Sequence, residues 1–164
     1  MKKIIPFIAG LLFTSCAWFQ PGFKSGLEGQ KLPDFLVTRE DNRTIFHTDS
    51  IYLGKSFILL LYRPDCPFCN GLIQDILNNS NTFSRTPIYL LTSYPDKDIN
   101  QFVARFHLEK YPNIIPLRDS ASVVFSYFKP IGVPYLVFYD KQKVLKSVFP
   151  GKTEIGILKT NLPD

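Results

Sequence analysis

The chain has 164 residues, of which 45% are hydrophobic and 20% are charged, a composition that predicts one globular domain and excludes an intrinsically disordered chain. The formal net charge is +5, but the basic residues are scattered along the sequence, so no nucleic-acid partner is predicted. Fifteen Phe and eight Tyr predict a strongly aromatic core.

The N-terminal residues 1–15 are predicted to be a signal peptide. Lys2 and Lys3 give a short positive start, and the apolar run over 4–13 that follows is too short to span a bilayer comfortably. The sequence Phe13-Thr14-Ser15-Cys16 resembles a bacterial lipobox, which implies cleavage before Cys16 and attachment of lipid to that cysteine. The alternatives are a plain secretory signal with an incidental cysteine, or an uncleaved anchor.

Residues 16–31 are predicted to form a lipid-anchored tether, because Pro21, Gly26 and Gly29 disfavour a helix. Ala17 stands directly after the cysteine, where the enterobacterial pattern for retention at the inner membrane has Asp. We therefore expect the protein in the cell envelope of a Gram-negative-type bacterium, on the periplasmic side, with the outer membrane favoured.

Apolar runs and turn residues alternate along the chain after the tether. The first part is expected to hold a hairpin, a buried strand, a helix, a second buried strand and a second helix. These lie at 35–38 with 44–47, at 57–62, at 66–78, at 87–92 and from 95 onward. Apolar residues of the second helix recur every three or four positions, which places them on one face.

The second part is expected to hold a short strand, a short helix capped by Asp119 or Ser120, two strands joined by a turn, and a last helix. These lie at 114–117, up to 128, at 135–139 with 144–149, and from 151 onward. Strands separated by helices predict an α/β fold, with a central mixed, mostly parallel sheet flanked by helices and extended by the N-terminal hairpin. The final hairpin predicts one antiparallel edge.

The stretch Cys66-Pro67-Phe68-Cys69 is the main candidate for chemistry. It places two cysteines between a buried strand and the first turn of a helix. Unpaired N–H groups and the positive end of the helix dipole stabilise a thiolate there, and the thiolate is the nucleophile of disulfide exchange. The pattern predicts a redox dithiol.

Metal binding has little support in the sequence. One pair of cysteines supplies only half of a four-coordinate zinc site. His47 and His107 stand alone, without the spacing of metal ligands, and are expected at the surface or in a supporting role. We therefore predict no metal and no cofactor.

Four motifs in order resemble the thioredoxin fold, and within it the TlpA-like membrane-tethered thiol–disulfide oxidoreductases of the redoxin superfamily. They are a pre-strand signature, the dithiol turn, a cis-proline loop and a closing hairpin. In this chain they read Leu32-Pro33-Asp34-Phe35, Cys66-Pro67-Phe68-Cys69, Gly132-Val133-Pro134, and Phe138-Tyr139-Asp140 with Phe149-Pro150-Gly151. The resemblance implies a thioredoxin-like domain over residues 32–164.

The resemblance also implies roles for single residues. Cys66 is the expected nucleophile, and Cys69 is the resolving thiol that closes a Cys66–Cys69 disulfide. Pro67 and Phe68 lie beside the thiols. The bond before Pro134 is expected to be cis, with the backbone of Val133 pairing with a substrate peptide like an added strand. The predicted substrate-binding residues are Pro67, Phe68, Val133 and Pro134.

Two departures from the family concern charge and proton transfer. Many relatives have an aromatic residue before the first cysteine, and this chain has Asp65. Thioredoxin buries an acid on the preceding strand, where this chain has Leu60, and a related site one turn after the motif is Leu72. Asp65 and Asp75 are alternative bases for Cys69, although both are expected to be solvated.

The predicted function is extracytoplasmic thiol–disulfide exchange with protein substrates, in the reducing direction. Expected partners are disulfide-containing proteins, a membrane-embedded thiol electron donor, and the membrane itself through lipid at Cys16. One alternative is a metal-handling or non-catalytic binding module with this fold. The other is a peroxiredoxin-type peroxidase, which needs Thr or Ser where this chain has Arg63.

Overall fold

The computed structural model describes residues 23–39, 44–51 and 53–162. The predicted signal peptide, Cys16 and the tip of the first hairpin at 40–43 therefore lie outside the described residues. Within these ranges, no helix has both the length and the apolar character needed to cross a membrane.

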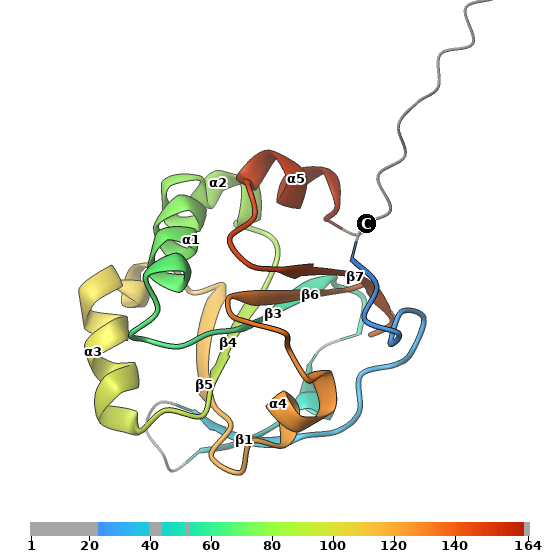
Figure 1. Ribbon diagram of the computed structural model, residues 1–164, viewed down its shortest axis with the longest axis horizontal. Coiled ribbons are helices and arrows are strands. Elements are labelled where there is room, and N and C mark those ends of the chain that lie inside the picture. Colours follow the sequence, from blue (N-terminus) through green and yellow to red (C-terminus); the bar gives the residue numbers. More distant parts are fainter. Residues whose placement is uncertain (1–22, 40–43, 52, 163–164) are drawn as a thin grey trace, which may run out of the picture.

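Seven strands form a single sheet in the order β2-β1-β5-β4-β3-β6-β7 (Figure 1). In chain order they are β1 (Leu36–Arg39), β2 (Ile45–His47), β3 (Phe57–Leu61), β4 (Ile88–Thr92), β5 (Ile114–Arg118), β6 (Tyr135–Tyr139) and β7 (Leu145–Pro150). Every strand predicted from the sequence is present. The first hairpin joins the same sheet through pairing of β1 with β5.

The predicted mixed sheet is confirmed, but the expectation that it is mostly parallel is wrong. Only β3–β4 and β4–β5 are parallel, and the other pairings between these strands are antiparallel. Helices α1 and α2 connect β3 to β4, and α3 connects β4 to β5; crossovers of this kind are what parallel neighbours require. Helix α4 lies in the connection from β5 to β6, which are not neighbours in the sheet. After β5 the chain reverses direction before β6 pairs with β3.

The helices are α1 (Pro67–Asn78), α2 (Ser80–Phe83), α3 (Asp96–Phe106), α4 (Val123–Phe128) and α5 (Ile155–Thr160). The sequence did not predict α2, nor the 3₁₀ turns at Thr48–Ser50 and Leu108–Lys110. Helices α1, α3 and α5 lie on one side of the sheet and α4 lies on the other (Figure 1).

Strand β3 divides the core between these two faces. Ile58 and Leu60 pack with α1 and α3, whereas Leu59 and Leu61 pack with α4, because successive side chains of a strand point to opposite sides. All four side chains are completely buried. A strand that is buried on both faces must be apolar throughout, which is why this run reads as continuous in the sequence.

Residues 23–32, here called the strap, pair through residues 29–32 with residues 143–145 at the start of β7. The N–H of Gly29 donates to Leu145 O at 2.9 Å, and the N–H of Leu145 donates to Gln30 O at 2.9 Å. Further along, the N–H of Leu32 donates to Lys143 O at 2.9 Å. The strap contains no helix, as the sequence predicted. It packs on the domain, however, whereas residues 23–31 were expected to belong to the tether over 16–31.

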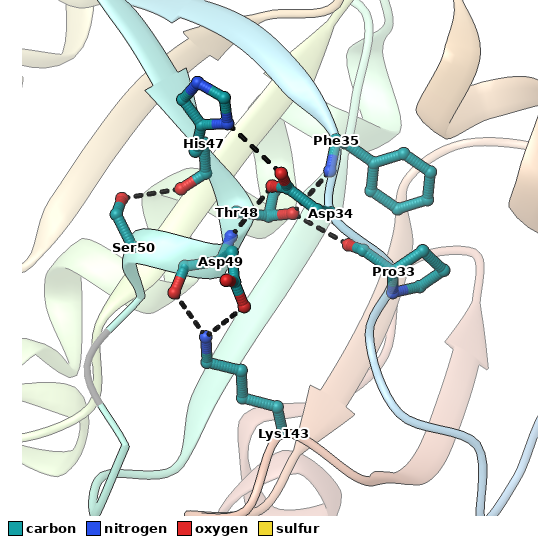
Figure 2. Close-up of polar contacts among 8 residues, drawn as sticks. All are labelled: Pro33, Asp34, Phe35, His47, Thr48, Asp49, Ser50 and Lys143. Carbon is teal, nitrogen blue, oxygen red and sulfur yellow. Dashed lines mark hydrogen bonds and ion pairs between the residues drawn. The ribbon is translucent and has the colours of Figure 1, made fainter.

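The end of the sheet opposite the cysteines is held by a polar network (Figure 2). The buried Thr48 hydroxyl accepts from Phe35 N at 2.7 Å and donates to Pro33 O at 2.8 Å. Lys143, also buried, donates from Nζ to Asp49 O at 2.6 Å. The network thus joins the segment before β1, the 3₁₀ turn and the β6–β7 turn.

Asp34 and His47 form the outer part of this network. His47 Nδ1 lies 3.1 Å from Asp34 Oδ2, and the N–H of Asp49 donates to Asp34 Oδ1 at 3.1 Å. These contacts hold the pKa of the Asp34 carboxyl below its usual value, with the His47 hydrogen bond as the main cause. His47 is therefore a surface residue engaged with a carboxylate.

Candidate dithiol site

The two cysteines lie where β3 runs into α1, at the C-terminal edge of the parallel strands. Cys66 is the N-cap of α1, with extended backbone angles, and Pro67 takes the first helical position, where a missing N–H costs nothing. The N–H of Cys66 donates to Arg63 O at 3.1 Å. This local geometry turns the chain sharply from the buried strand into the helix.

The Cys66 thiol faces the helix on one side and the loop before β6 on the other. Its Sγ accepts from the N–H of Cys69 at 3.4 Å and lies 3.7 Å from Val133 O, to which the thiol donates. The peptide bond between Val133 and Pro134 is cis, which confirms the sequence prediction. Two segments 67 residues apart therefore meet at one sulfur atom.

The Cys69 thiol is buried behind Cys66, with only 1% of the residue exposed. Burial raises the pKa of the Cys69 thiol to about 12, although a backbone hydrogen bond from Arg63 acts in the opposite direction. Both cysteines are free thiols in this structure. The two sulfurs thus differ: Cys66 is accessible, and Cys69 is protected and protonated.

The side chains around Cys69 are apolar, including the one at the position where thioredoxin has a buried acid. Leu60 and Leu72 are completely buried. Asp65 pairs with Arg63, and Asp75 pairs with Lys152 Nζ at 2.8 Å. Because both carboxylates are about half exposed, the expectation that they are solvated is confirmed.

Arg63, Asp65 and Tyr94 form a surface cluster next to Cys66. Arg63 donates to Asp65 Oδ2 at 2.9 Å and to the Tyr94 hydroxyl at 2.9 Å, and that hydroxyl lies 3.0 Å from both carboxylate oxygens. Asp65 therefore has a lowered pKa, chiefly through the hydrogen bond from Arg63. The opposing charges of Arg63 and Asp65, which flank Cys66, neutralise each other. Tyr94 was not identified from the sequence, since nothing there links it to a loop 29 residues earlier.

The predicted substrate-binding residues differ in exposure. Phe68 is 66% exposed, Pro67 is exposed, Val133 is partly buried and Pro134 is buried. Ile131, in the same loop as Val133, is 74% exposed and was not identified from the sequence. The exposed side chains of Phe68 and Ile131 leave apolar surface at this end of the domain open to another polypeptide.

Helix α4 leads into this loop and is anchored by Asp119. The buried Asp119 carboxylate accepts from the N–H groups of Val123, Val124 and Phe125 at 2.8, 2.9 and 3.1 Å. Of the two caps that the sequence offered, Asp119 is the one used. It satisfies three donors at the start of a short helix and so fixes where the helix begins.

Metal ligands do not gather near the thiols. In the part of the chain that the structure describes, no group of three or more His, Cys, Asp or Glu side chains is arranged to hold a metal ion. His107 ends α3 and lies 3.3 Å from Glu109, far along the chain from the dithiol.

Comparison with known proteins found relatives only among solved structures. No protein-family model matches the chain, and no curated protein matches it. A secreted disulfide oxidoreductase of Mycobacterium tuberculosis, homologous to E. coli DsbE, is 21% identical with a TM-score of 0.63, and the match covers 77% of this chain and 92% of that one.

Two further structures give the same result. M. tuberculosis DsbF is 21% identical with a TM-score of 0.63, covering 84% of this chain and 95% of that one. StoA of Bacillus subtilis is 13% identical with a TM-score of 0.61, covering 78% and 95%. The chain therefore has a thioredoxin-like fold over nearly all of the described residues.

Proposed function

We propose that this protein is an extracytoplasmic thiol–disulfide oxidoreductase that reduces protein disulfides through Cys66 and Cys69. One observation carries the proposal: an accessible thiol at a helix start faces the carbonyl of Val133, with a second, buried thiol one turn behind it. The two mycobacterial neighbours support it, because one is described as a disulfide oxidoreductase and the other was solved in mixed oxidised and reduced forms.

The reaction proceeds in two exchanges. The thiolate of Cys66 attacks a substrate disulfide, forming a mixed disulfide and releasing one substrate thiolate, which takes up a proton. Cys69 then attacks the sulfur of Cys66, so that a Cys66–Cys69 disulfide forms as the second substrate thiol leaves. The dithiol loses two electrons and the substrate disulfide gains them.

Burial of Cys69 determines the order of these steps. A thiol with a pKa of about 12 is protonated at neutral pH and is a poor nucleophile until its proton is removed. No carboxylate replaces the acid of thioredoxin at Leu60, so we propose that the departing substrate thiolate takes the proton. Cys66 therefore reacts first, and Cys69 reacts only when the mixed disulfide lies against it.

The loop of Val133 and Pro134 is the proposed substrate contact. Proline offers no N–H, while Val133 O lies 3.7 Å from the nucleophilic sulfur. A substrate peptide that pairs with Val133 like a short added strand brings its cystine next to Cys66. Pro67 and the exposed Phe68 complete the contact on the opposite side of the sulfur.

Location and electron supply complete the proposal. We propose cleavage before Cys16, lipid attachment to that cysteine, and a domain on the periplasmic side of the outer membrane. The word "secreted" in the description of the mycobacterial neighbour supports an extracytoplasmic site. Since each turnover oxidises the dithiol, a reductant is required to restore it, and we propose a membrane-embedded thiol donor for this role.

Insulin reduction in the presence of dithiothreitol tests the activity directly. We expect the domain to accelerate precipitation of the insulin B chain and the Cys66→Ser variant to give the uncatalysed rate. Ser84→Ala, an exposed change far from the thiols, is the matched control and should keep full activity. Equal rates for the wild type and Cys66→Ser would refute the proposal.

The reduction potential of the dithiol tests the direction. A value near or below that of thioredoxin, about −270 mV, supports a reductase, whereas one near −120 mV indicates an oxidant. Separately, labelling of cells with a radioactive fatty acid tests the anchor: the wild type should incorporate label and Cys16→Ser should not.

A further inference from the structure

The strap and the loop before β6 form a surface beside the dithiol, here called the strap face. It surrounds a shallow hollow, lined in part by Phe23, Lys24, Tyr127, Lys129, Ile131 and Tyr135. The ring of Phe23 meets that of Tyr135 edge-on, with centroids 6.2 Å apart. Because Tyr135 directly follows the cis proline, the strap face is continuous with the loop that touches Cys66.

Exposed apolar side chains lie on the strap face next to basic ones. Phe23 is 37% exposed and Ile131 is 74% exposed. Lys24 and Lys129 are both exposed. The nearby Glu28 carboxylate is hydrogen-bonded within the strap: it accepts from the N–H groups of Ser25 and Gly26 at 2.8 and 3.0 Å. Apolar groups rimmed by lysines suit the interface of an anionic bilayer.

The position of the strap limits how far this face can lie from a lipid on Cys16. Phe23 follows Cys16 by seven positions, and seven fully extended residues span at most about 25 Å. Gly29 to Leu32 are hydrogen-bonded to the β7 edge, so this part of the predicted tether adds no reach. Acyl chains on the proposed lipidated Cys16 are therefore attached within about 25 Å of Phe23.

We propose that the strap face rests on the surface of the bilayer, with Ile131 and Phe23 at the level of the lipid headgroups. This inference rests on the proposed lipidation of Cys16. It places the loop of Val133, and with it Cys66, beside the membrane. The dithiol then meets partners that present a thiol or disulfide at the membrane surface, including the proposed membrane-embedded donor.

Tryptophan quenching by brominated lipids tests this orientation. The chain has a single tryptophan, Trp18, so in a Trp18→Phe background the variant Ile131→Trp carries one reporter on the strap face. Leu53→Trp is the matched control, because Leu53 is 60% exposed but precedes β3 at the opposite end of the sheet. Each lipidated full-length variant is reconstituted into vesicles of phosphatidylglycerol and phosphatidylcholine with brominated acyl chains.

We expect at least threefold stronger quenching at position 131 than at position 53. The additional changes Lys24→Gln and Lys129→Gln should reduce the difference in anionic vesicles and leave it unchanged in neutral ones. Equal quenching at the two positions, in protein that carries fatty acid and reduces insulin, would overturn the orientation alone.

Two other outcomes also overturn the proposal. Blue-shifted emission from the Ile131→Trp variant in a detergent-solubilised dimer would assign the strap face to a second copy of the chain. Failure of Cys16 to incorporate fatty acid would remove the anchor on which the orientation depends. Insulin reduction by the domain in solution requires neither result, so the proposed activity is judged separately.

Discussion

The two ends of the sheet are held together in different ways. At the dithiol end, Arg63, Asp65 and Tyr94 bond to one another at the surface while Phe68 and Ile131 face solvent. At the opposite end, buried polar side chains connect segments that are far apart in the sequence (Figure 2). Asp119 and Thr92 are exceptions, because both are buried polar residues at the dithiol end.

This difference indicates that reactivity and stability depend largely on separate residues. Surface ion pairs contribute little to stability because water screens them, whereas a buried polar group without its partner is costly. The dithiol end can therefore remain open to a partner without weakening the domain. The following predictions test that separation, from the largest effect to the smallest.

The largest effect is expected in alkaline solution. There Cys69, a residue of the dithiol end, should affect the stability of the whole domain. Its thiol stays protonated in the folded protein up to about pH 12, while the unfolded chain loses that proton near 9.0. Stability of the reduced protein should fall by about 1.4 kcal/mol per pH unit between 9 and 12, or about 4 kcal/mol in all, and show no contribution from Cys69 below 9.

Denaturant unfolding of reduced wild type and of Cys69→Ala, measured at intervals from about pH 8 to about pH 10.5, gives this contribution as a difference. The alanine variant should lack the additional alkaline slope. Parallel slopes for the two proteins would show that Cys69 titrates equally in the folded and unfolded states.

Loss of the resolving thiol should affect chemistry far more than stability. In Cys69→Ser we expect release of reduced substrate to slow at least a hundredfold, on the order of 3 kcal/mol in barrier, and a mixed disulfide on Cys66 to accumulate. Mass spectrometry under non-reducing conditions detects that adduct. The double variant Cys66→Ser, Cys69→Ser is the control and should form none; an adduct there would assign the nucleophile elsewhere.

Thr48→Val should lower stability and leave the chemistry unchanged. It keeps the shape of the side chain but removes a buried hydroxyl that satisfies two backbone groups, which should lower the free energy of unfolding by about 2 kcal/mol. Insulin reduction should be unchanged. Ser50→Ala, which removes an exposed hydroxyl of the same turn, should cost less than about 0.5 kcal/mol. A large loss of activity in Thr48→Val would show that the two ends are coupled.

The smallest effect is expected for Tyr94→Phe. Removing the hydroxyl deletes contacts to Arg63 and Asp65 but leaves the ion pair in place at a half-exposed site. We expect a change of no more than about 0.5 kcal/mol in stability, measured by denaturant unfolding. Arg63→Gln is the comparison variant and should have the larger effect, because it leaves the Asp65 carboxylate without its cationic partner beside Cys66. A larger effect from Tyr94→Phe than from Arg63→Gln would show that the hydroxyl, and not the ion pair, dominates this cluster.

Local patterns in the sequence predicted most of the fold. The continuous apolar run from Phe57 to Leu61 indicated a central strand, and the sequence after it indicated a helix that begins at the cysteines. The direction of β6 was not predictable, since periodicity carries no information on how a strand returns to the sheet. Motif resemblance correctly identified the cis bond before Pro134.

The remaining features depend on long-range contacts. Tyr94 joins Asp65 across 29 positions, and Lys143 reaches Asp49 across 94. The strap was expected to be a free tether because Gly and Pro disfavour a helix there. Those residues are equally compatible with an extended segment that pairs with a sheet edge. The strap takes this form, and not that of a free tether, because the edge of the sheet at the start of β7 is available for pairing.

The pairing of the strap with β7 also sets an order of events during synthesis. Gly29 bonds to Leu145, so the strap has no strand to pair with until almost the whole domain has been made and β7 has formed. Throughout that interval residues 29–32 lack the partners at 143–145 to which they bond in the folded domain. Residues 29–32 therefore complete this edge of the sheet late, after the hairpin of β6 and β7 has formed.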